Sequence, residues 1–96
     1  PGRADLATAV RYLLQLLAEK APGNAVEVRV PPFGAVQAVE GPRHTRGTPP
    51  NVVEMDPEAW IAVALGDRSW QAAVAEGLIR ASGTRAHLDD VLPLRP

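Results

Sequence analysis

Three basic side chains, Arg43, His44 and Arg46, are the residues of this chain best suited to hold a ligand. They lie in residues 41–50, GPRHTRGTPP, between two apolar segments. Two guanidinium groups on a loop stiffened by glycine and proline could hold a carboxylate or phosphate, because arginine offers paired planar donors. His44 could add a donor whose charge changes near neutral pH. This pattern predicts binding of an anionic group.

A second interpretation gives these cations only a structural role. Arg43 and Arg46 would pair with Glu40 and Glu54 across a hairpin and order the loop. A surface ion pair contributes only about 0 to 1 kcal/mol, too little to require so many charges in one loop. The sequence alone favours neither interpretation.

The residue sets of common catalytic sites are absent from the sequence. There is no cysteine, which excludes a disulfide framework, a thiolate zinc site and a cysteine nucleophile. His44 and His87 are the only histidines and form no HExxH motif, and Ser69 and Ser82 lie outside any GxSxG motif. We therefore expect a protein that is not an enzyme and uses neither a metal nor a cofactor.

The composition of the chain also argues against some classes of binding partner. The net charge of −1 and the pI of about 6.1 argue against nucleic acid. No apolar run approaches the roughly 18 residues that span a bilayer, so we expect no stable membrane insertion. A chain without cysteine suits a reducing compartment, and we expect a cytoplasmic location. The sequence starts at Pro1 and not at methionine, which leaves open a leader upstream.

The elements that would position these residues fit one domain, residues 1–96. Residues 3–20 form an amphipathic helix whose stripe consists of Leu6, Val10, Leu13, Leu14 and Leu17. Such a helix could bind a membrane surface or a partner helix, but a domain this small needs it for its own core.

Alternating apolar residues predict strands at 26–30, 35–40 and 51–55. Their spacing suggests an antiparallel meander in which residues 41–50 form a long hairpin loop, and long loops on compact domains are often functional.

The second half predicts mostly helices. Asp56 caps a helix over 57–65 that ends at Gly66, and Ser69 or Asp67 caps another over 70–76. A strand over 78–82 and a short helix over 85–92 complete the chain. This order predicts an α+β fold with helices packed on one face of a mainly antiparallel sheet.

Six apolar residues on and before the predicted helix pair could line a pocket. They are Met55, Trp60, Ile61, Leu65, Trp70 and Val74. The same residue types build an ordinary core, so the sequence does not separate a pocket from a core.

Two blocks of the chain resemble a known family. The first block is GAVQAVEGPRHTRGTPPNVVEMDPEAW, and the second consists of the later helices followed by GLIRASGTRA. Both blocks are similar to small actinobacterial proteins of the sterol carrier protein type-2 superfamily, also called bacterial sterol-carrier orthologues. The resemblance covers nearly the whole chain. It implies a sterol-carrier-like sheet and helices that enclose an apolar tunnel, and a lipid-like small molecule as ligand.

Two other roles stay open beside lipid binding. The resemblance extends to the accessory domain of mycothiol-dependent maleylpyruvate isomerases, which sits beside a metal-binding helical bundle that is missing here. The chain could therefore supply a substrate- or thiol-cofactor-binding domain to a separate enzyme. It could also be an interaction module that uses its leucine stripe or a sheet edge to bind a protein partner.

Overall fold

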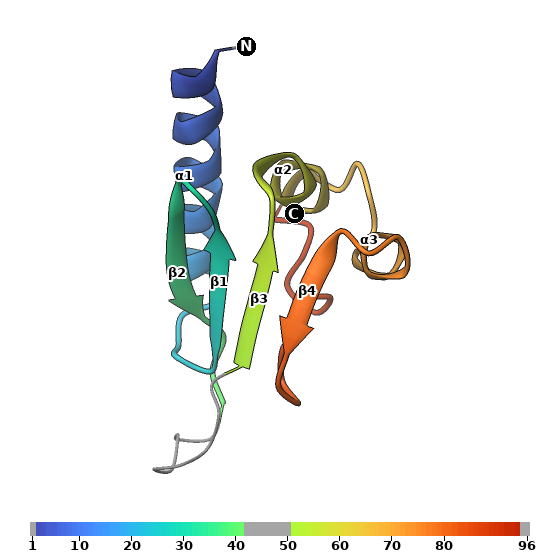
Figure 1. The fold of residues 1–96 in the computed structure, drawn as a ribbon. Helices are drawn as coiled ribbons and strands as arrows, with labels where there is room; N and C mark the ends of the chain where they lie inside the picture. The colour runs from blue at the N-terminus through green and yellow to red at the C-terminus, as the bar shows by residue number, and fades with distance from the viewer. Residues whose placement is uncertain (1, 42–50, 95–96) are drawn as a thin grey trace.

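The computed structural model describes residues 2–41 and 51–94, which form a four-stranded sheet with helices on one face (Figure 1). The elements in chain order are α1 (Arg3–Lys20), β1 (Val26–Val30), β2 (Gly34–Ala38), β3 (Asn51–Met55), α2 (Pro57–Leu65), α3 (Trp70–Ala75) and β4 (Ile79–Ser82). The strands lie in the order β2-β1-β3-β4. Since β1–β2 and β3–β4 are antiparallel and β1–β3 is parallel, the sheet is mainly antiparallel, and the predicted α+β class is confirmed.

The predicted meander is wrong, because β3 pairs with β1 and not with β2. Val26 of β1 has Ala38 of β2 on one side and Asn51 of β3 on the other. The end of β2 and the start of β3 therefore lie on the two sides of β1, about 10 Å apart at the usual strand spacing.

Helix α1 forms where the leucine stripe predicts it. Ala7, Val10, Leu13, Leu14 and Leu17 are buried, and the helix packs on β2 and α2. It ends at Ala21, whose N–H still donates to the carbonyl of Leu17 at 2.9 Å. Within the part of the chain that the structure describes, no helix is both long and apolar enough to cross a membrane.

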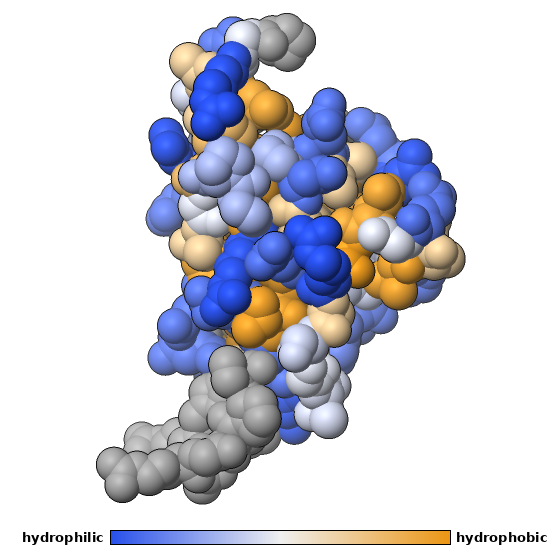
Figure 2. All heavy atoms as spheres, viewed as in Figure 1, coloured by the Kyte–Doolittle hydropathy of each residue, from blue (hydrophilic) through white to orange (hydrophobic). Residues whose placement is uncertain are grey.

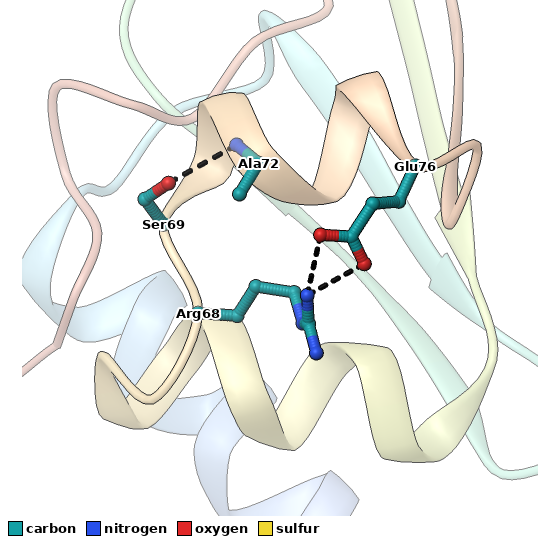
Figure 3. A network of polar contacts seen from close by, with 4 residues as sticks. All are labelled: Arg68, Ser69, Ala72 and Glu76. Carbon is teal, nitrogen blue, oxygen red and sulfur yellow. Dashed lines mark hydrogen bonds and ion pairs between the residues drawn. The ribbon is translucent and has the colours of Figure 1, made fainter.

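Helices α2 and α3 begin at the predicted caps. The Asp56 carboxylate accepts from the N–H of Ala59 at 2.9 Å, and the Ser69 hydroxyl accepts from the N–H of Ala72 at 3.0 Å. Arg68, just before α3, donates to both carboxylate oxygens of Glu76, just after it, at 2.5 and 2.6 Å (Figure 3). This contact ties together the two ends of a helix only six residues long.

The core lies between the sheet and the helices. Its largest fully buried side chains include Trp60, Leu17, Met55 and Leu88. The indole N–H of Trp60 donates to the carbonyl of Val10 at 3.2 Å, which joins α2 to α1. No buried polar or charged side chain occurs among the described residues.

The opposite face of the sheet is polar. Figure 2 shows hydrophilic residues gathered over the middle of this face. Arg29 pairs with Glu27 at 3.2 Å, and Arg80 pairs with Glu54 at 3.0 Å. The Glu27 carboxylate, through its hydrogen bond and its charge, raises the pKa of Arg29. The helices therefore cover one face only, as predicted.

The predicted helix over 85–92 is wrong. Residues 83–94, which we call the C-terminal segment, run as turns and extended chain on the helix side of the sheet. Ala86 and Leu88 are buried while His87 between them is exposed, an alternation typical of extended chain. The N–H of Arg85, where that helix would begin, donates to the side chain of Asn51 at 3.0 Å.

Candidate ligand-binding site

The C-terminal segment is held against both long helices by main-chain contacts. The Lys20 ammonium, at the end of α1, donates to the carbonyls of Val91 and Pro93 at 2.9 Å each. The N–H of Leu94 donates to the carbonyl of Ala64 in α2, also at 2.9 Å. These contacts fix the segment beside the end of the core, where it forms walls of two concave surfaces.

Asn51 fixes the start of this segment. Its side-chain amide donates to the carbonyl of Ala25 at 2.8 Å, and its oxygen accepts from the N–H of Arg85. Gly83 has a φ of +105°, and a side-chain carbon there would overlap the Asn51 oxygen. One half-buried amide thus sets where the Arg85 main chain lies.

Val39, directly after β2, has an unusual backbone conformation. Its φ of +70° lies in the left-handed region, where a β-branched residue is a true outlier and costs about 1 to 3 kcal/mol. Two hydrogen bonds hold it there, from its N–H to Ala21 at 2.6 Å and from the N–H of Ala25 to its carbonyl at 2.9 Å. The turn at Val39 brings Glu40 beside the C-terminal segment.

These elements enclose a small space that we call the inner cavity, with a volume of about 170 Å³. Its lining residues are Ala25, Val39, Glu40, Arg85, His87, Leu88, Asp90 and Val91. Ala25 and Leu88 are buried and apolar, whereas Arg85, His87 and Asp90 are exposed. The cavity therefore has an apolar interior and a charged rim.

A second concave surface, which we call the α3 groove, lies between α3 and the C-terminal segment. It is lined by Trp70, Gln71, Val74, Ala75, His87 and Asp89, measures about 500 Å³ and is open to solvent. Val74 is 46% exposed, which is unusual for a large apolar side chain in this domain.

His87 joins the two surfaces, because it lines both the inner cavity and the α3 groove. Its Nδ1 lies 2.9 Å from a carboxylate oxygen of Asp89, which holds the ring in place. One elongated ligand could therefore lie in the groove and reach the cavity past His87.

The predicted site residues separate into three groups. Met55 and Trp60 are fully buried in the core, and Ile61 and Leu65 pack against it half-buried. Trp70 and Val74 line the α3 groove. Arg43, His44 and Arg46 lie outside the described residues, so their role stays a prediction.

The hairpin that would pair Arg43 and Arg46 with Glu40 and Glu54 does not form, because β2 and β3 lie on opposite sides of β1. Glu54 instead pairs with Arg80 across the β3–β4 ladder.

Sequence reasoning missed Arg85 and Asp90 as site residues. Both fall in the stretch predicted as a helix, where they read as ordinary surface charges. The alternation of Ala86 and Leu88 with His87 is the signal that could have indicated an extended segment. Nothing in the spacing of Glu40 and Asp90 indicates that they share a cavity.

Across residues 2–41 and 51–94, no three histidine, cysteine, aspartate or glutamate side chains come together as a metal site would require. The Ser69 hydroxyl serves as the cap of α3. What the two surfaces offer is apolar area beside charged groups, which fits an amphipathic molecule.

Comparison with known proteins gives one family. The model of a family described as bacterial SCP ortholog matches residues 2–94 of the chain. No curated protein matches it.

Proposed function

The chain belongs to the family of bacterial orthologues of sterol carrier protein, and from this membership we propose that it binds a hydrophobic, lipid-like molecule without changing it chemically. Family membership points to a lipid-binding carrier role. The finer assignment, to the α3 groove and the inner cavity, rests on this chain's own residues.

The α3 groove is the observation that carries the proposal. Val74 is exposed and Trp70 half-buried on the same concave surface, next to a cavity with apolar walls. Ligand sites for small molecules measure about 300 to 1,000 Å³ and are lined mainly by apolar and aromatic side chains. The groove lies within that range, and the cavity at its end gives a second surface for the same ligand.

Arg43, His44 and Arg46 remain our proposal for holding an anionic group of this ligand. In support, Gly41, the first residue of their segment, lies against Ala25 and beside the Arg85 side chain, which both line the inner cavity. The basic segment therefore begins at the cavity rim. A short distance along the chain would bring its guanidinium groups to a ligand there.

Replacing Val74 with aspartate should weaken binding of a fluorescent fatty-acid probe about tenfold or more, because a charge would replace apolar area in the groove. Titration followed by probe fluorescence and by quenching of Trp70 would measure this. Tyr12→Asp is the matched control, since Tyr12 is 62% exposed on α1 and does not line the groove. Equal loss in both variants, or no saturable binding by the unmodified protein, would count against the proposal.

Native mass spectrometry of the purified protein would separate the remaining roles. A co-purified lipid supports the carrier. A stoichiometric partner chain would instead favour an accessory domain for a separate enzyme or an interaction module.

Changing Arg43 and Arg46 together to alanine should weaken binding of a fatty acid by about 1.5 to 3 kcal/mol, the contribution of lost charge-assisted hydrogen bonds. Binding of the corresponding fatty alcohol should hardly change, because it lacks the charge. Calorimetric titration of both ligands measures the difference. If the unmodified protein already binds acid and alcohol equally, the two arginines do not hold an anion.

A further inference from the structure

The rim of the inner cavity carries charges of both signs, and from this mixture we infer that the polar end of the ligand is zwitterionic, with one negative and one positive group. The inference rests on the proposed lipid-binding function and adds to it the charge of the ligand's head. It depends on Arg85, Glu40 and Asp90, which are brought together from two distant parts of the chain.

Arg85 supplies the site for the negative group. Its main chain is fixed by the 3.0 Å hydrogen bond to Asn51, and its side chain runs beside Gly41 at the cavity rim. Among residues 2–41 and 51–94, no carboxylate lies within ion-pair distance of its guanidinium group. A planar guanidinium at this position can bind a carboxylate or phosphate with two parallel hydrogen bonds.

Glu40 and Asp90 supply the site for the positive group. Two carboxylates at one rim attract an ammonium group, so a head that carries a positive group beside its negative one is bound more tightly than a head that is only anionic. The nearby His87 already contacts Asp89, a carboxylate on the groove side, so it leaves both rim carboxylates to a ligand.

The position of Glu40 depends on strained backbone at Val39. A left-handed valine persists only where the surrounding structure imposes it, and such residues cluster at binding sites. Here the hydrogen bonds to Ala21 and Ala25 impose it, and Glu40, the next residue, lines the inner cavity together with the C-terminal segment.

The volumes of the inner cavity and the α3 groove indicate which end of the ligand each of them binds. The cavity, at about 170 Å³, is smaller than the roughly 300 to 1,000 Å³ of sites that enclose a whole drug-sized molecule. It therefore accepts one end of the ligand. The apolar tail would lie past His87 in the α3 groove, against Trp70 and Val74.

Four ligands with the same dodecyl tail test this directly: dodecanol, dodecanoate, dodecyltrimethylammonium and the zwitterion dodecyl betaine. Each would be titrated calorimetrically below its micelle concentration. We expect the betaine to bind about tenfold more tightly than the other three, because it alone satisfies both halves of the rim.

Single variants identify which charge holds which group. Arg85→Gln should weaken the betaine and dodecanoate and leave the cation unchanged, whereas Asp90→Asn should weaken the betaine and the cation. Arg80→Gln and Glu54→Gln are matched controls, because these residues pair on the opposite face of the sheet. Rim variants that change affinity no more than the controls would overturn the inference.

The failures of the two proposals are distinguishable. Equal binding of dodecanol and the betaine by the unmodified protein keeps lipid binding and rejects the zwitterionic head. Absence of binding by all four ligands rejects lipid binding itself, and the inference with it.

Discussion

Replacing Trp60 with alanine should lower the free energy of unfolding by about 3 to 5 kcal/mol, the usual cost of removing a fully buried tryptophan. Trp60 is 0% exposed and also donates its indole N–H to the carbonyl of Val10. Domains of this kind have a total stability of roughly 5 to 15 kcal/mol, so the loss is a large share of it. Urea unfolding followed by far-ultraviolet circular dichroism measures the change.

Two further variants keep this prediction testable if Trp60→Ala does not fold. Trp60→Phe retains most of the ring but removes the indole N–H that donates to the Val10 carbonyl, and should cost about 1 to 2 kcal/mol. Trp70→Ala is the matched control, because Trp70 is only half-buried in the α3 groove, and should cost about 1 kcal/mol. Equal losses in Trp60→Ala and Trp70→Ala would contradict the central place of Trp60 in the core.

Replacing Gly23 with alanine should destabilise the protein by about 3 kcal/mol or more, through backbone strain and overlap together. Gly23 has a φ of +147°, and a side-chain carbon there would overlap the main-chain carbonyl of Val39. Backbone cannot rotate aside as the end of a flexible side chain can. The denaturant concentration at the unfolding midpoint, followed by tryptophan fluorescence, reports the loss.

The variant Gly77→Ala measures the cost of backbone strain alone, without the overlap that an added side-chain carbon causes at Gly23. Gly77 also has a positive φ, +76°, but a side-chain carbon there meets no atom within 4 Å. Its replacement should therefore cost only the left-handed conformation, about 1 to 2 kcal/mol. If both alanine variants lose the same stability, Gly23 is not held against Val39.

Local signals in the sequence predicted the helices α1, α2 and α3 well. The leucine stripe gave α1 its bounds because helical spacing places those residues on one buried face. Asp56 and Ser69 marked the starts of α2 and α3 because their side chains satisfy free N–H groups that any helix start exposes.

Strand pairing could not be predicted in the same way. The apolar alternation in β1 and β3 shows that each has a buried face, but it does not say which neighbour each strand takes. The parallel β1–β3 pair depends on where the whole chain can pass, and adjacent strands in sequence were assumed to be adjacent in space.

The candidate site depends on the same long-range placement. Glu40 and Arg85 lie far apart in the sequence and line the same cavity because Val39 and Asn51 position their main chains. Trp70 and Val74 were predicted as possible pocket residues, but so were Met55 and Trp60, which are in the core. Residue type alone does not distinguish these pairs, since a core and a pocket use the same side chains.

The contact of Lys20 with the C-terminal segment has a consequence for how the protein is made. Its two acceptors lie 71 and 73 residues further along the chain, so α1 leaves the ribosome long before they do. Until Val91 and Pro93 have emerged, the apolar surface that Leu88 will cover stays open on the nascent chain. The inner cavity does not yet exist at that stage, because residues 85–91 form much of its wall. Any molecule bound there is therefore taken up only after these residues have been translated.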